Sequence, residues 1–349
     1  MSEAPDADEN APAVPPSRLR GDSARRAPAT GETVTAIESQ LRAMRTDAEH
    51  HIAHARAEFD QAKERIRQRT GRDLIVAILI GVAIGVVVVA SLIFVKWLFA
   101  FFALGAMVLA VFEFSRALQV SGRRVDVVPQ LVAGTLLLAS GFLAGLWIHW
   151  VTTIVAVAFV VVWRLVAQLF AHNGRPHTEV LADVLVAALV QLYVPFLTSM
   201  ALILLAEDGG EWWVLAFLVL AVVADTGAYV SGLTFGRGGR HPMAPRISPK
   251  KTWEGFAGAC VAALAAGALL AVFMLDVPWW AGLIFGAVVL LTATIGDLGE
   301  SMLKRDLGIK DMSSWLPGHG GVLDRLDSIL PSATAALALY YLLSPLGVS

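Results

Sequence analysis

The residues that could do chemistry are concentrated in one segment, Ser301 to Asp327. It reads SMLKRDLGIKDMSSWLPGHGGVLDRLD and lies between two long apolar runs. Its ionisable side chains are Lys304, Arg305, Lys310, Arg325, His319, Asp306, Asp311, Asp324 and Asp327. Cationic side chains can hold phosphates, and glycines such as Gly320 and Gly321 let backbone N–H groups approach them closely. The segment therefore indicates a site for an anionic ligand.

Two aspartates of this segment, Asp324 and Asp327, are candidates for a metal site. Three residues apart on a helix, they would share one face and could hold a divalent cation. A simpler interpretation is a cytoplasmic loop that is basic only because it faces inward. That interpretation explains the scattered Lys and Arg. It does not explain Asp297, Asp324 and Asp327 at the edges of apolar runs, where ionisable residues usually serve function.

A second polar region begins with Asp225, inside the apolar run VLAVVADTGAYVSGLTFG. A carboxylate there costs about 2.5–3.5 kcal/mol on insertion scales, so we expect a partner or a bound cation. The alternative is an Asp that reaches water near a helix end. A long basic connection follows over residues 236–255.

Ser248 and Pro249 in this connection are predicted to cap and begin the next helix. Lys250 and Lys251 would then stand at a helix N-terminus, whose exposed N–H groups also favour phosphate. Their plainer role is to anchor the cytoplasmic face as positive charges.

The composition is that of a polytopic membrane protein. Of the 349 residues 56% are hydrophobic and 16% charged, and the mean hydropathy is +0.66. Soluble proteins average about 45–50% apolar and about 25% charged residues. The net charge of −2 argues against a general nucleic-acid binder. A single cysteine, Cys260, excludes a disulfide within the chain and a Cys/His zinc cluster.

Apolar runs of about twenty residues, long enough to span a hydrocarbon core, dominate from Leu74 onward. We expect an all-α polytopic fold of about nine transmembrane helices, near 74–93, 96–115, 127–147, 150–170, 180–205, 212–233, 254–275, 279–298 and 323–345.

The basic residues predict the orientation. They fall at Arg72 and then after alternate runs, in the connections around 116–124, 175, 237–251 and 304–310. By the positive-inside rule the N-terminus and these connections are cytoplasmic and the C-terminus lies outside. The sequence thus predicts a multi-pass protein of the inner or plasma membrane whose site-bearing loops face the cytoplasm.

Three regions are predicted along the chain. Residues 1–32, rich in Ala, Pro, Ser and charge, cannot offset their ordering entropy and are expected to be a disordered tail. Residues 33–72 carry apolar side chains at spacings of three and four, which predicts an amphipathic cytoplasmic helix with an accessory role. Residues 73–349 form the transmembrane domain.

The order of residues in the two polar regions closely resembles one enzyme family. Residues 301–327 contain Ser-x-Leu-Lys-Arg, then after four residues Lys-Asp, and then Leu-Pro-x-His-Gly-Gly-Val-x-Asp-Arg-Leu-Asp. This order resembles the C-terminal motif of phosphatidate cytidylyltransferases, also called CDP-diacylglycerol synthases. From Asp225 on, the chain carries Asp-Thr-Gly-Ala-Tyr, then Phe-Gly, then Ile-Ser-Pro-Lys-Lys-Thr-Trp-Glu-Gly. These runs resemble the segment that precedes the C-terminal motif in the same family, with a departure at 237–245. The resemblance covers roughly 74–345, with specific motifs only from Asp225.

The resemblance implies transfer of a cytidylyl group from CTP to phosphatidic acid, giving CDP-diacylglycerol and pyrophosphate for phospholipid biosynthesis. It implies Mg²⁺ as cofactor and leaves open a second, monovalent cation. The implied partners are CTP, phosphatidic acid and the bilayer, with no nucleic acid and with a homodimer left open. The residues suit this reaction, because joining two polyanions depends mostly on positioning and charge neutralisation.

The resemblance also assigns roles to residues. Asp297 and Asp324 are the first candidates for metal ligands, with Asp225 and Asp327 next. The predicted catalytic set is Lys304, Arg305, Asp324, Arg325 and Asp327. The predicted substrate-binding set is Ser248, Lys250, Lys251, Lys310, His319, Gly320 and Gly321. A phosphate monoester is already anionic near neutral pH, so His319 is expected to bind phosphate or pack the turn rather than act as a base.

Two other functions remain open from the sequence. A related CTP-dependent enzyme could use another lipid phosphate or a polyprenol, because the motifs concern phosphates and metal rather than lipid tails. An ion-coupled transporter also carries intramembrane carboxylates, but basic, glycine-rich loops suit phosphates better, and the two halves show no obvious repeat. The Asp-Gly-x-x-Ala-Arg motif of CDP-alcohol phosphotransferases is absent.

Overall fold

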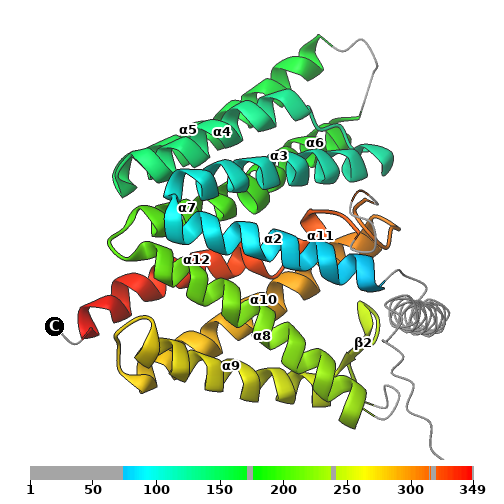
Figure 1. The fold of residues 1–349 in the computed structure, drawn as a ribbon. Helices are drawn as coiled ribbons and strands as arrows, with labels where there is room; N and C mark the ends of the chain where they lie inside the picture. Colours follow the sequence, from blue (N-terminus) through cyan, green and yellow to red (C-terminus); the bar gives the residue numbers. More distant parts are fainter. Residues whose placement is uncertain (1–73, 171–175, 237–240, 314, 316–319, 348–349) are drawn as a thin grey trace, which may run out of the picture. The chain divides into compact units, whose positions relative to one another are not determined.

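A computed structural model describes residues 74–170, 176–236, 241–313, 315 and 320–347. The predicted tail 1–32 and the predicted amphipathic helix 33–72 lie outside the described residues, so both stay predictions. The described residues belong to one unit, 66–349, and this unit is mostly helical (Figure 1).

The helices follow the apolar runs of the sequence. They are α2 (Leu74–Phe94), α3 (Lys96–Val120), α4 (Val127–Leu143), α5 (Leu146–Leu169), α6 (His177–Gln191), α7 (Leu197–Ala206), α8 (Gly210–Phe235), α9 (Trp253–Phe273), α10 (Trp279–Asp306), α11 (Leu323–Leu326) and α12 (Ile329–Leu343). The π-helical η1 (Leu192–Phe196), the 3₁₀ turn η2 (Ser344–Leu346) and the strands β1 (Pro242–Ala244) and β2 (Ser248–Thr252) complete the described elements.

The prediction of a helical polytopic membrane protein is confirmed. Within the described ranges seven helical segments are long and apolar enough to cross a membrane, and two shorter apolar helices, Gly81–Phe94 and Val127–Leu143, accompany them. The count of nine spans and the orientation stay predictions.

One predicted span, 180–205, is interrupted in the middle. Helices α6 and α7 form a single stretch, His177–Ala206, joined by η1. Pro195 lies inside η1. Proline lacks a backbone N–H and its ring clashes with the preceding turn, so the helix widens locally instead of breaking.

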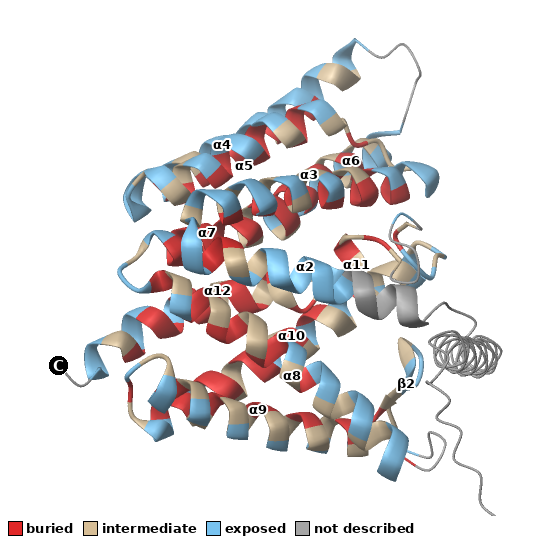
Figure 2. Ribbon diagram, in the orientation of Figure 1, coloured by how far each residue is buried: buried red, intermediate tan, exposed pale blue. Residues whose placement is uncertain are grey.

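Helix α12 lies at the centre of the unit. It packs against α7, α8 and α10, while α8, α9 and α10 contact one another on one side and α4, α5 and α6 on the other (Figure 1). The buried residues line the facing sides of these helices, and the outer faces are exposed (Figure 2). Large apolar side chains such as Trp147 and Phe273 are exposed there. A lipid-facing surface accounts for this distribution.

Glycines set the distance between α9 and α10. A Cβ added at Gly282 would lie 2.2 Å from the Gly267 carbonyl oxygen, and one at Gly286 would lie 2.4 Å from the Ala263 oxygen. Such close backbone approach is the usual basis of helix association in membranes.

An ion network around a buried arginine joins α5 to α6 and to the start of α4. Arg164 is 4% exposed, and its guanidinium lies 3.2 Å from Asp126 Oδ2 and 3.6 Å from Asp183 Oδ2. Asp183 on α6 also accepts the backbone N–H of Arg124 at 3.0 Å. The sequence analysis did not identify Asp126, Arg164 or Asp183.

The expected start of α9 at Ser248 and Pro249 is wrong. Both residues lie in β2, which pairs antiparallel with β1, Pro242 opposite Thr252 and Ala244 opposite Ser248. The N-cap of α9 is Thr252, whose hydroxyl accepts the Gly255 N–H at 3.1 Å. Strand pairing satisfies the backbone of Ser248–Thr252, so the helix begins one short strand later.

Candidate functional site

The site is built on the last turns of α10. Asp297, Glu300, Ser301 and Lys304 recur at spacings of three and four and therefore share one face. The segment expected as a loop from Ser301 begins as helix, because α10 continues to Asp306. In Figure 1 this end of α10, the hairpin and α11 lie at the same end of the unit, opposite the C-terminus.

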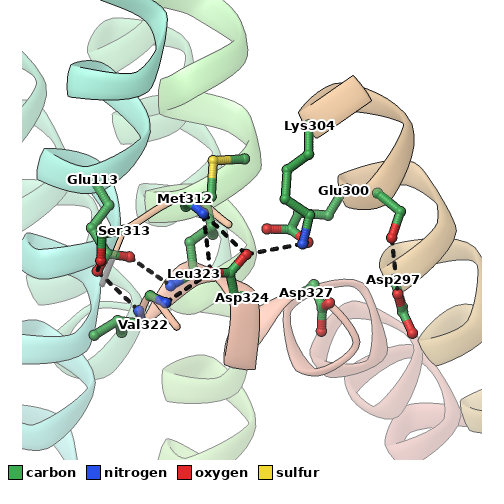
Figure 3. Close-up of polar contacts among 12 residues, drawn as sticks. Glu113, Asp297, Glu300, Lys304, Met312, Ser313, Val322, Leu323, Asp324 and Asp327 are labelled. Carbon is green, nitrogen blue, oxygen red and sulfur yellow. Dashed lines mark hydrogen bonds and ion pairs between the residues drawn. The ribbon is translucent and has the colours of Figure 1, made fainter. Parts of the chain in front are cut away.

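Lys304 joins α10 to α11. Its ammonium donates to Asp324 Oδ1 at 2.9 Å and forms an ion pair with Glu300, one turn earlier on its own helix (Figure 3). Its side chain is 12% exposed, and those of Glu300 and Asp324 are 0% and 5% exposed. One cation thus lies against two buried carboxyl groups.

Asp324 organises the turn that precedes it. Its carboxylate accepts the N–H of Gly321 at 2.7 Å and that of Met312 at 3.1 Å to Oδ2 (Figure 3). Gly320 has φ +85°, and a Cβ there would lie 2.9 Å from Asp324 Oδ2. Both the backbone conformation and the close approach therefore require glycine at this position.

Two contacts join the hairpin to α10. Lys251 on β2 forms an ion pair with Asp297, which also accepts from Ser301 Oγ at 3.3 Å. Arg305 Nε donates to the carbonyl of Ile247, in the hairpin turn, at 3.3 Å. The two polar regions of the sequence therefore meet at the end of α10.

The remaining predicted carboxylates lie near this meeting point. Asp225 on α8 is exposed and interacts electrostatically with Asp297, Lys251 and Arg325. Asp327, whose Oδ1 accepts the Ser328 N–H at 2.6 Å, interacts electrostatically with Asp297 and with Asp225. The fold thus gathers three carboxylates from α8, α10 and the end of α11.

The donor chemistry fits Mg²⁺ held with help from a substrate. Mg²⁺ prefers one or two carboxylates completed by phosphates and water. Asp225, Asp297 and Asp327 offer such oxygens, whereas Asp324 already accepts two backbone N–H groups and the Lys304 ammonium. Among the described residues no group of three His, Cys, Asp or Glu could hold a metal by itself.

Three of the predicted substrate-binding residues that the structure describes take no part in these contacts. Lys250 and Lys310 are exposed, and Ser248 is half-buried on β2. His319 lies outside the described residues, so its predicted role stays a prediction.

The sequence analysis missed Glu113. This residue of α3 is 1% exposed. Its carboxylate accepts Ser313 Oγ at 2.5 Å, Val322 N–H at 3.0 Å and Leu323 N–H at 2.9 Å (Figure 3). A carboxylate inside the apolar run AVFEFS was the signal that could have identified it, by the same argument that identified Asp225.

The chain is similar to known proteins over most of its length. The model of the cytidylyltransferase family matches residues 75–343. The phosphatidate cytidylyltransferase of Mycobacterium bovis is 38% identical over 288 residues, which are 79% of this chain and 90% of the relative. The enzyme of the same name from Mycobacterium leprae is 37% identical over 291 residues, with the same two coverages. That of Helicobacter pylori is 37% identical over 218 residues, 59% of this chain and 80% of the relative.

The family match spans both polar regions and the helices that bring them together, and it covers most of the chain. The chain therefore belongs to the cytidylyltransferase family.

Proposed function

We propose that this protein transfers a cytidylyl group from CTP to phosphatidic acid, releasing pyrophosphate, the activity for which its mycobacterial relatives are named. The observation that carries the proposal is the junction at the end of α10. There the Lys251–Asp297 ion pair and the Lys304 bridge to Asp324 bring both polar regions together.

Different basic side chains at this junction would bind different phosphate groups of the two anionic substrates. Lys250 and Lys310 are exposed at its edges and would contact phosphate oxygens. Arg305 and Lys251 are held near the site by the hairpin contacts and would neutralise phosphate charge from two directions. Because both reactants are anionic, such positioning of cations supplies most of the catalysis expected.

Asp297, with Asp225 or Asp327, would hold Mg²⁺, and the earlier candidate Asp324 would instead fix the turn before α11. The metal, when bound, would neutralise charge on the phosphates. Lys304 would remain ion-paired with Asp324 and Glu300 while the substrates bind.

We further propose that the site faces the cytoplasm, where CTP is present, and opens sideways to the inner leaflet for the lipid phosphate. The alternation of basic connections supports this orientation. The homodimer and the monovalent cation stay predictions.

The test is formation of CDP-lipid from CTP and phosphatidic acid by the purified full-length chain in detergent, with Mg²⁺ and with EDTA. We expect activity that EDTA abolishes and that Asp297→Asn lowers by about 100-fold or more. The matched control is Asp276→Asn, in the connection after α9. Asp276 is exposed and has φ 51°, which Asn adopts readily, so its activity should stay within about twofold.

Other outcomes would correct the proposal. Activity with another lipid phosphate but not with phosphatidic acid would keep the mechanism and change the acceptor. Absence of CTP turnover with any lipid phosphate would overturn it and favour a transporter.

A further inference from the structure

Glu113 links the two halves of the chain at the site without belonging to either polar region. It lies on α3, and its three donors come from the segment before and at the start of α11, 200 to 210 residues later in the sequence. The adjacent Phe112 stacks on Trp315 of the same segment, with 5.3 Å between ring centroids. Helix α3 therefore holds this segment by two consecutive side chains.

The backbone N–H groups of the turn are divided between two carboxylates. Gly321 donates to Asp324, whereas Val322 and Leu323 donate to Glu113 (Figure 3). A Cβ on Gly321 would lie 2.7 Å from Glu113 Oε2 and 3.1 Å from Asp324 Oδ2, so the turn is packed between both acids. Three successive amides thus have fixed directions only while both carboxylates are in place.

A buried carboxylate in an apolar helix is costly unless it is well hydrogen-bonded. The donors of Glu113 meet that need, and they belong to the segment that presents Asp324 to Lys304. A pocket of about 390 Å³ opens beside this contact and is lined in part by Arg116, Asp311 and Trp315. Glu113 and Ser313 also line this pocket, so their contact forms one wall of a cavity at the site.

We propose that Glu113 is a positioning residue for cytidylyl transfer: it clamps the turn before α11 so that Asp324 meets Lys304 on α10. This inference rests on the proposed function for its kinetic part. Glu113 itself touches neither Lys304 nor the hairpin in the described contacts and acts through the turn.

The experiment compares the wild type with Glu113→Gln and Ser313→Ala, all full-length in detergent. The control is Asp183→Asn, because Asp183 is likewise a buried carboxylate in a membrane helix but lies in the Arg164 network. Two quantities are measured: kcat and KM for CTP, and hydrogen exchange at the Val322 and Leu323 amides.

Gln keeps one acceptor oxygen and turns an NH₂ group toward an N–H donor. We expect Glu113→Gln to lower kcat by about 100-fold while KM for CTP changes by less than about threefold. The two amides should exchange at least about tenfold faster, as they lose a charged acceptor. Ser313→Ala, which removes one donor and leaves both amide contacts, should lower kcat by about fivefold. Asp183→Asn should leave kcat per folded molecule and exchange at these amides within about twofold.

Three results would overturn the clamp. The first is unchanged exchange at Val322 and Leu323 in Glu113→Gln. The second is an equal loss of kcat in Glu113→Gln and Asp183→Asn, which would show a merely structural role. The third is a lower KM for CTP in Glu113→Gln, which would show that Glu113 competes with phosphate for the same amides. If Glu113→Gln does not fold, Ser313→Ala decides through kcat, because this variant leaves both amide contacts in place: a kcat equal to that of the wild type would overturn the clamp.

Hydrogen exchange at these amides does not depend on catalytic turnover. The measurements can therefore contradict the proposed function and the role of Glu113 independently of each other. A wild type without CDP-lipid formation would overturn the proposed function, while exchange at Val322 and Leu323 would still decide whether Glu113 holds the turn.

Discussion

At the scale of single residues, Lys304 has a task that its motif does not reveal. The resemblance assigned it to phosphate, yet its ammonium is directed at Glu300 and Asp324. Both carboxyl groups are almost completely buried, so removal of their shared cation leaves both without their ion-pair partner. Losing one partner of a buried ion pair typically costs about 3–5 kcal/mol.

We therefore expect Lys304→Met to abolish CDP-lipid formation and also to lower the thermal unfolding midpoint in detergent. The double variant Glu300→Gln/Lys304→Met removes one of the two acids and should recover part of that midpoint without recovering activity. Thermal unfolding followed by a tryptophan or thiol probe measures the first effect, and the CTP assay the second. Recovery of activity in the double variant would show that Lys304 serves charge balance alone.

At the scale of elements, the packing of α10 against α9 depends on glycine. The close approach at Gly267, Gly282 and Gly286 sets how α10 lies on α9. Gly296, farther along α10, approaches Asp327: a Cβ there would lie 2.2 Å from the Asp327 oxygen. The same helix thus uses glycines both where it packs on α9 and beside Asp297 in the charged site.

Gly282→Ala is expected to destabilise the protein, because its Cβ would lie 2.2 Å from the Gly267 oxygen and 2.5 Å from the Ala271 Cβ. Overpacking of this kind costs about 1–3 kcal/mol. The control is Gly105→Ala on α3, where nothing lies within 4 Å and where alanine favours the helix by about 1 kcal/mol. Unfolding midpoints in detergent measure both changes. Equal midpoints for Gly282→Ala and the wild type would contradict the packing argument.

At the scale of the whole described unit, the hairpin and α11 lie at one end of the helices and the C-terminus at the other (Figure 1). If the basic connections are cytoplasmic, the end of α12 must be external. The chain has one cysteine, Cys260, so a cysteine-free variant can be prepared by Cys260→Ala.

In that background we expect Ser344→Cys to react with a membrane-impermeant maleimide in intact cells. Arg246→Cys, next to the hairpin turn, should react only after the membrane is opened. The opposite pattern would invert the proposed orientation and place the site away from cytosolic CTP.

Features that are local in the chain could be predicted from the sequence. Long apolar runs predicted where the membrane helices lie, because spanning a bilayer requires about twenty apolar residues in succession. Asp225 and Asp297 stood out because charge is costly within or beside such runs. Lys304 stood out because ionisable residues are concentrated in the segment between two of them. The two motifs indicated the family, which the comparison confirmed.

Which of these residues contact one another could not be predicted and became visible in the folded structure. The start of α9 was predicted wrongly because Ser248 and Pro249 suit a helix start, while pairing with β1, which the local pattern does not show, holds them in a strand. The partners of Lys304 and the clamp at Glu113 join residues far apart in the chain. Such contacts depend on how the helices pack against one another. The spacing of residues along the sequence predicts which residues share a face of one helix, but not which helix that face contacts.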